Sequence, residues 1–168
     1  MDAETRRSLD AFVVAVSRCS RQTDVVNKIE RADGPSIVDL MGAYACDVPL
    51  GEYVSRFLLY ARLVPADLAC ASLHLRRLSD RGYLCPRSLH RAVAGVLVCV
   101  YKFNHDVFFS NATLARIAGV KLAELNRIEL RVLSILEWKL YLDPAEVGAV
   151  LKRWSHTGSN CIEWCRAF

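Results

Sequence analysis

The chain has 168 residues, a hydrophobic fraction of 53% and a formal net charge of +4. A chain of this size and composition can bury one hydrophobic core but has no room for several domains, and it is too apolar to be disordered over most of its length. The positive charge comes mostly from arginines scattered along the sequence. This pattern excludes the dense basic block typical of a nucleic-acid arm or a polybasic membrane patch.

The sequence also lacks signals for export. The longest uninterrupted apolar run, residues 92–101, is about half of the ~20 residues that a membrane span needs, and charged residues stand where a signal peptide would place its apolar segment. The seven cysteines form no Cys-x-x-Cys pair. We therefore expect a soluble protein of the cytoplasm or nucleus, without membrane partners, whose cysteines are reduced.

The first third of the chain has helical patterning in two places. Residues 4–19 carry apolar side chains on one face and arginines opposite, which predicts an amphipathic helix. A second, short helix is predicted from Thr23-Asp24, which can cap it, to the stop at Asp33-Gly34-Pro35. The conformation of residues 36–48 is left open.

The middle of the chain is divided by prolines. One helix is predicted from Pro49 to the break at Pro65, and the next from Pro65 to Arg81-Gly82, where glycine suits a C-terminal cap. A third helix is predicted to start at Pro86. Its centre, residues 92–101, is apolar all round, which indicates a helix in the middle of the core.

Three further helices are predicted in the last part of the chain. Ser110 or Asn111 can cap a short helix that ends at Gly119, and a longer helix covers 121–138. A last helix covers 145–154, and the final fourteen residues are expected to form a tail. The apolar stripe of the longer helix consists of Leu122, Leu125, Val132, Leu133 and Leu136. No strand pattern is visible, so the predicted fold is all-α.

Motifs for catalysis and for metal or cofactor binding are weak. The sequence contains no glycine-rich phosphate loop, no His-Glu-x-x-His and no Gly-x-Ser-x-Gly, so we expect neither an enzyme nor a bound cofactor. His156, Cys161 and Cys165 offer three potential metal ligands at loose spacing. Structural zinc usually takes four, so no metal site is predicted.

A helix-turn-helix unit is an alternative for residues 113–125. A small residue stands four positions before Gly119, with aliphatic residues on both sides, as in units that pack two such helices. The second helix, however, has Lys121, Arg127 and Arg131 as its positive groups and carries two glutamates. DNA binding is therefore kept as the alternative function, with no nucleic acid expected as the main partner.

Two charged residues on apolar helices need an explanation. Lys102 follows the all-apolar segment, and Glu129 is in register with an apolar stripe. Ionised groups are costly to bury unless they are paired or hydrogen-bonded. The two residues could form a structural ion pair, or they could bind the backbone of a partner beside apolar anchors such as Phe103, Leu133 and Trp138. The physics of the sequence leaves both alternatives open.

The ordered motifs of residues 45–143 resemble the single-box cyclins of the P and U types, which are related to the cyclin of the yeast phosphate-response kinase. The residues that carry the resemblance are Glu52-Tyr53, Arg56-Phe57, Leu75, Arg77-Leu78, His90-Arg91, Lys102-Phe103, Asp106, Asn111, Ala115, Gly119-Val120, Glu124-Leu125-Asn126 and Glu129-Leu130. They stand in the family's order with short gaps between them, which makes the resemblance specific.

The resemblance implies a five-helix cyclin box at 45–143, a helical extension at 1–44, and a C-terminal helix with a tail at 144–168. It also implies a regulatory subunit, monomeric by itself, that binds and activates a cyclin-dependent kinase. The residues that would hold the kinase αC helix are Lys102 and Glu129, beside an apolar groove formed by Cys99, Phe103, Leu133 and Leu140. Kinase catalysis requires an αC glutamate to pair with the ATP-site lysine, so holding this helix inward would activate the enzyme.

The chain departs from the family pattern at two places. Arg76 stands where the family usually has an aspartate that pairs with an arginine of the preceding helix, here Arg56. His105-Asp106 replaces two consecutive acidic residues. We therefore expect the electrostatics between these two helices to differ from the family's, and we assume no docking at the acidic spot.

Overall fold

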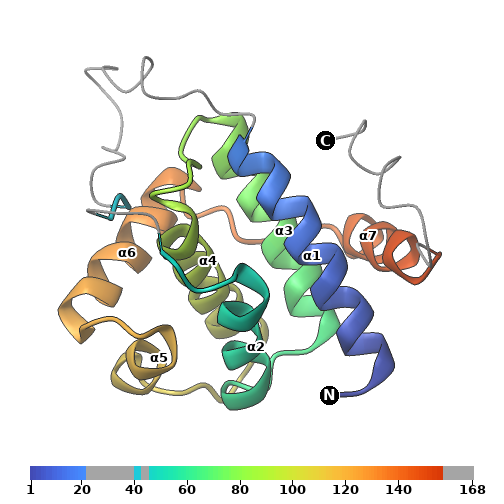
Figure 1. The fold of residues 1–168 in the computed structure, drawn as a ribbon, viewed down its shortest axis with the longest axis horizontal. Helices are drawn as coiled ribbons and strands as arrows, with labels where there is room; N and C mark the ends of the chain where they lie inside the picture. The colour runs from blue at the N-terminus through green and yellow to red at the C-terminus, as the bar shows by residue number, and fades with distance from the viewer. Residues whose placement is uncertain (22–39, 43–45, 157–168) are drawn as a thin grey trace.

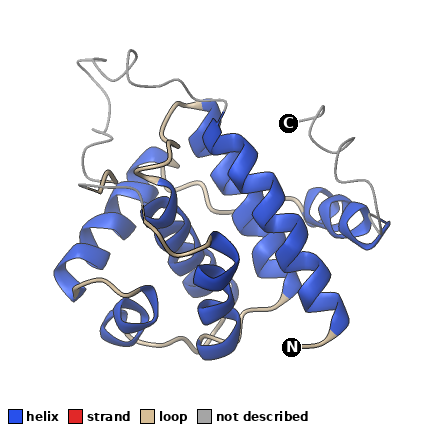
Figure 2. Ribbon diagram, in the orientation of Figure 1, coloured by secondary structure: helices blue, strands red, loops and turns tan. Residues whose placement is uncertain are grey.

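The computed structural model describes residues 1–21, 40–42 and 46–156, and in these residues it contains helices and no strand (Figure 2). The described helices are α1 (Ala3–Arg21), α2 (Leu50–Tyr60), α3 (Pro65–Asp80), α4 (Leu89–Asn104), α5 (Asn111–Ala118), α6 (Leu122–Ile135) and α7 (Pro144–His156). The predicted all-α fold is confirmed. The short helix predicted near Thr23 and the tail beyond residue 156 lie outside the described residues.

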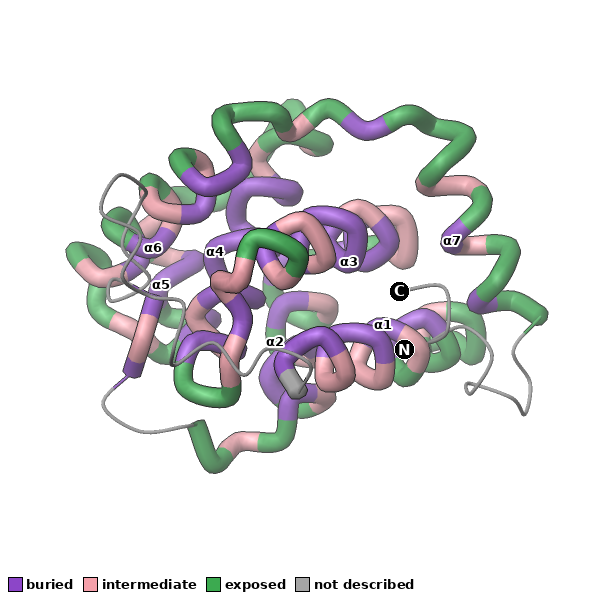
Figure 3. Tube along the Cα trace, turned by 90° about the horizontal axis from the view of Figure 1, so that it is seen from above, coloured by how far each residue is buried: buried purple, intermediate pink, exposed green. Residues whose placement is uncertain are grey.

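Helix α4 is the centre of the fold (Figure 1). Every residue from Ala92 to Tyr101 is buried, as the apolar segment predicts. It contacts α3 and α6, with α5 packed on α6, while α1 and α7 pack against α3 on the other side. Figure 3 shows buried residues along both α3 and α4.

Helix α1 shares this core. Leu9, Phe12 and Val16 are buried on one face of α1, and Phe12 is fully enclosed. The helix lies along α3, with α7 against both (Figure 1). Val150 and Trp154 are the buried residues of α7. The two terminal helices therefore extend the hydrophobic core beyond the five central helices.

The start of α4 differs from the prediction. The helix begins at Leu89 and not at Pro86, because residues 86–88 form a turn. The buried hydroxyl of Ser88 accepts a hydrogen bond from the backbone N–H of Cys85 at 2.9 Å, which closes that turn. A side-chain hydroxyl thus competes with helical pairing at this point.

The end of α6 also differs, because the helix stops at Ile135 and not at Trp138. Glu137 and Trp138 both adopt left-handed backbone conformations, with φ of 55° and 61°. The N–H of Trp138 donates to the carbonyl oxygen of Leu133 at 2.9 Å, as in a Schellman-type helix end. The predicted stripe is corrected as well: Leu122 is 45% exposed, and the fully buried Ile128 faces the core.

Helix α3 holds the segment that follows α6. The buried His74 lies close to the backbone of Leu140, whose carbonyl group favours the protonated form of the imidazole. Arg77 Nη1 donates to the carbonyl oxygen of Lys139 at 3.3 Å, and Arg81 donates to the carbonyl oxygen of Ile135. These contacts fix residues 139–140 against the core although no helix covers them.

Gly95 sets the closest approach of α4 and α6. A Cβ added at Gly95 would lie 2.7 Å from a methyl carbon of Ile128 and 2.7 Å from one of Val132. Both distances are far below van der Waals contact, and both neighbours are fully buried. The helices can therefore pack at this separation only with glycine at position 95.

We expect Gly95→Ala to lower the free energy of unfolding by about 1–3 kcal/mol, because the added methyl group overpacks the α4–α6 contact. Gly148→Ala is the matched control, since a Cβ at Gly148 in α7 would meet nothing within 4 Å. The control should gain about 0.5–1 kcal/mol from its better helix propensity. Urea unfolding followed by circular dichroism measures both, and equal gains in the two variants would contradict the packing argument.

The buried His74 should make stability depend on pH. Burial, together with the charge of Arg77, lowers the pKa of His74 from 6.5 to about 4 in the folded protein. The unfolded chain therefore binds this proton more tightly, and the contribution of His74 is complete above about pH 6.5 and declines as the pH falls toward 4. We expect a loss of roughly 3 kcal/mol by pH 4. Urea titrations between neutral and acidic pH should show a shallower slope for His74→Gln than for the parent protein.

Candidate functional site

Lys102 and Glu129 form an ion pair between α4 and α6. Lys102 Nζ lies 2.6 Å from Glu129 Oε1, and the two side chains are 25% and 13% exposed. The buried Cys99 lies one turn before Lys102. Burial raises the pKa of the Cys99 thiol to about 12, and the negative charge of Glu129 adds to this effect. The pair therefore lies beside a neutral thiol and keeps one edge open to solvent.

Asn111, the first residue of α5, holds the second oxygen of Glu129. Its Nδ2 donates to Glu129 Oε2 at 2.7 Å and to Asn126 Oδ1 at 2.7 Å. The opposite amide orientation would place the Asn111 oxygen against the carboxylate, so the donor orientation fits this site. The Glu129 carboxylate is thus fixed from α4 and from α5. The sequence motif contains Asn111, but its spacing gave no reason to assign it this role.

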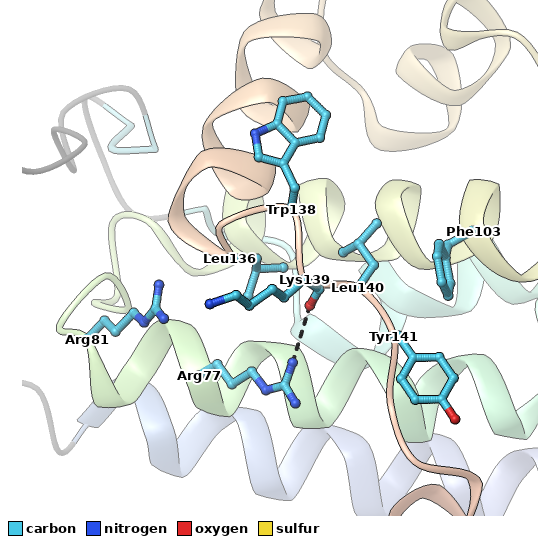
Figure 4. A pocket seen from close by; sticks show the side chains of 8 residues that line it. All are labelled: Arg77, Arg81, Phe103, Leu136, Trp138, Lys139, Leu140 and Tyr141. Atoms are coloured by element: carbon cyan, nitrogen blue, oxygen red, sulfur yellow. Dashed lines mark hydrogen bonds between the residues drawn. The ribbon is translucent and has the colours of Figure 1, made fainter.

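A groove of about 530 Å³ lies beside Phe103 (Figure 4). It is lined by Arg77, Arg81, Phe103, Leu136, Trp138, Lys139, Leu140 and Tyr141. The exposed fractions of Trp138 and Tyr141 are 67% and 71%, which is unusual for large side chains of a helical domain. An exposed apolar surface of this kind is typical of an interaction site.

The predicted site residues have different positions relative to this groove. Phe103 and Leu140 line it. Leu133 is partly buried and packs against the core, and Cys99 is 2% exposed. Of the four apolar residues, the structure thus places Phe103 and Leu140 at the groove and Cys99 and Leu133 toward the core.

The arginine that replaces the family's aspartate has a surface partner. Arg76 Nε lies 3.9 Å from Asp80 Oδ2, and both side chains are largely exposed. A Cβ built at Gly119 would lie 3.8 Å from Arg56 Nη1, so this guanidinium lies at the C-terminal end of α5. The negative end of the helix dipole favours a cation there. The two arginines thus occupy separate environments.

His105 has a buried carboxylate as its partner. His105 Nε2 lies 3.0 Å from Asp67 Oδ2, and Asp67 is 1% exposed. Asp67 also accepts hydrogen bonds from the N–H of Val64 at 2.9 Å and from Asn104 Nδ2 at 3.0 Å. An acidic residue at position 105 would repel this carboxylate, whereas histidine links the start of α3 to the end of α4.

The helix-turn-helix alternative gains no support from α5 and α6. Leu125, Ile128 and Val132 of α6 are buried against the core, and Glu124 pairs with Arg91 of α4 at 2.5 Å. The second helix of the unit is thereby tied to α4 along one face. This arrangement reduces the number of α6 side chains that could reach base edges in a DNA groove.

In the part of the chain that the structure describes, no group of three or more potential ligands could hold a metal ion, and Cys161 and Cys165 lie outside that part. Within the same residues, no helix has both the length and the apolar character of a membrane span.

Comparisons with known proteins agree on one family. The Cyclin family matches residues 12–140. Cyclin-P3-1 of Oryza sativa subsp. japonica is 31% identical over 110 residues, which cover 64% of this chain and 47% of that protein. Cyclin-U3-1 of Arabidopsis thaliana is 28% identical over 120 residues, or 70% of this chain and 54% of that protein.

A fungal relative gives a shorter match. PHO85 cyclin-7 of Saccharomyces cerevisiae is 38% identical over 61 residues, which cover 36% of this chain and 21% of that protein. The chain spans about half the length of the plant relatives. The family match covers most of the described helices. The chain therefore belongs to the cyclin family, and it is similar to cyclins of the P and U types and to a yeast PHO85 cyclin.

Proposed function

We propose that this cyclin binds and activates a cyclin-dependent kinase by holding the kinase αC helix at the Lys102–Glu129 pair. The observation that carries the proposal is the partly exposed ion pair of Lys102 and Glu129, together with Phe103, which follows Lys102 in the chain and lines an apolar groove. Glu129 is oriented by Asn111, and Lys102 remains 25% exposed. The relative named PHO85 cyclin-7 supports a kinase as the partner.

The chemistry of the pair fits the backbone of a helix end. A lysine ammonium has three donors, of which one is directed to Glu129, and a carboxylate can accept several hydrogen bonds. The pair can therefore serve a carbonyl group and an N–H group of the kinase helix at the same time. Phe103 and Leu140 supply apolar contacts in the groove, while Cys99 and Leu133 belong to the hydrophobic core.

Binding at this surface would act on the kinase as a population shift. The competent state requires the αC glutamate to pair with the ATP-site lysine. A cyclin that binds αC better in its inward position stabilises that state by the difference in binding free energy. The cyclin itself needs no catalytic group for this role.

We expect Lys102→Ala and Glu129→Ala each to weaken kinase binding by about 30-fold or more, because each removes a partly desolvated polar anchor of the interface. Kinase activation should fall in parallel, and the circular-dichroism melt should stay cooperative. Titration calorimetry with a purified cyclin-dependent kinase measures the affinity.

Arg91→Ala and Glu124→Ala are the matched controls, since this second ion pair joins the same two helices with Nη2–Oε1 and Nε–Oε1 distances of 2.5 Å and 2.8 Å. We expect them to leave the kinase affinity unchanged. Parent-like binding by both Lys102→Ala and Glu129→Ala would refute the assignment of this pair as the clamp that holds the kinase αC helix. Loss of the cooperative melt in these two variants would instead support a purely structural pair.

Asn111 is expected to act through Glu129. Asn111→Ala should weaken kinase binding, because the carboxylate loses the donor that orients its second oxygen. In a Glu129→Ala background the same substitution should have no further effect on affinity, whereas an independent role would give additive losses. A double-mutant cycle of kinase affinities decides between the two.

A further inference from the structure

The groove lined by Phe103 has a basic side and an apolar side. Arg77 and Arg81 project from α3, and Lys139 lies close to them on the segment after α6 (Figure 4). Phe103, Leu140 and Tyr141 line the remainder, with Trp138 at the rim. None of the described residues that line the groove is acidic. The groove thus offers cations and apolar surface together.

Arg77, Arg81 and Lys139 form a basic wall of the groove, and their existing contacts leave this wall with a net positive charge. Arg81 Nη2 and Lys139 Nζ share one carboxylate, that of Glu137, at 3.0 Å and 2.6 Å. The hydrogen bond from Lys139 and the charge of Arg81 lower the pKa of Glu137, so this carboxylate stays ionised. Arg77 donates to a carbonyl oxygen, which carries no net charge. Three cations therefore face one carboxylate among these groups.

The backbone at the rim is strained. Glu137 and Trp138 are consecutive residues other than glycine with φ of 55° and 61°, a conformation that is costly for both. The consequence is that Trp138 stands 67% exposed at the edge of the groove. Tryptophan is enriched among the residues that dominate binding energy at interfaces. The strained turn thus holds an anchor residue beside the basic wall.

We propose that this basic wall, made of Arg77, Arg81 and Lys139, binds an acidic segment of the kinase next to the helix held by Lys102 and Glu129. The inference rests on the proposed function and adds the chemistry of the partner segment. Phe103 lines the groove and directly follows Lys102 in α4, so one partner can reach both surfaces. Charge complementarity of this kind speeds association and selects among related partners.

The test is a charge-reversal variant, Arg77→Glu with Lys139→Glu, measured against a purified cyclin-dependent kinase by surface plasmon resonance. At low ionic strength we expect the dissociation constant to rise on the order of tenfold or more, mainly through slower association. The salt dependence of binding should become weaker, because the attraction that salt screens is lost. The charge-conserving pair Arg77→Lys with Lys139→Arg should keep most of the affinity.

Lys121→Glu with Arg127→Glu is the matched control, because both residues are exposed near the start of α6 and neither lines the groove. It makes the same change in net charge and should leave affinity close to that of the parent. An equal loss in this control would overturn the proposal in favour of a general charge effect. Parent-like affinity of the groove reversal, or a groove reversal that affects duplex-DNA binding and not kinase binding, would also overturn it.

The outcomes separate this inference from the proposed function. If Lys102→Ala weakens kinase binding and the groove reversal does not, only the acidic-segment proposal fails. If Lys102→Ala and Glu129→Ala both bind like the parent, the clamp itself is refuted. Arg77→Gln, which removes one charge without adding another, should show a smaller loss in the same direction and covers the case in which the double reversal fails to fold.

Discussion

The close packing of α4 on α6 is the constraint on which the candidate site depends. With Gly95 at the contact, the two helices approach until Ile128 and Val132 fill the space that a side chain would take. At this separation Lys102 reaches Glu129 on one side of the contact, and Arg91 reaches Glu124 on the other. A wider spacing of the two helices would separate both ion pairs, so the packing of the core sets the distances within these pairs.

The energetics of the Lys102–Glu129 pair favour a role beyond stability. A partly exposed ion pair contributes little net free energy to folding, because desolvation and lost side-chain entropy offset most of the attraction. Asn111 nevertheless fixes the second carboxylate oxygen, and its own buried Oδ1 has no hydrogen-bond partner among the residues that the structure describes. An arrangement with this cost in folding free energy is better explained by pre-organisation for a partner. Because the polar groups are already oriented, less conformational entropy is lost on binding.

Local patterns in the sequence predicted the helices well but not the contacts between them. The all-apolar segment of α4 required burial on every side, and the structure confirms it. In α6 the predicted stripe is wrong at its first residue, because Leu122 satisfies the period yet lies beyond the edge of the core, and it omits the buried Ile128. The partners of Asn111 and His105 lie 18 and 38 residues away, so only the packing of whole helices brings these groups together.

The groove shows how one set of residues can serve both folding and recognition. Arg77 donates to a carbonyl oxygen of the segment after α6 and Arg81 donates to one at the end of α6, and the same guanidinium groups supply positive charge to the groove. Guanidinium has five donors, so a hydrogen bond to the backbone leaves capacity for a carboxylate. The strained turn at Glu137 and Trp138 depends on those backbone contacts. The side chains of the basic wall thus carry both the structural support of this turn and the positive charge of the groove. A substitution in the wall is tolerated only where another contact supports the turn. The Lys102–Glu129 pair, in contrast, has its own support in α4, α5 and α6.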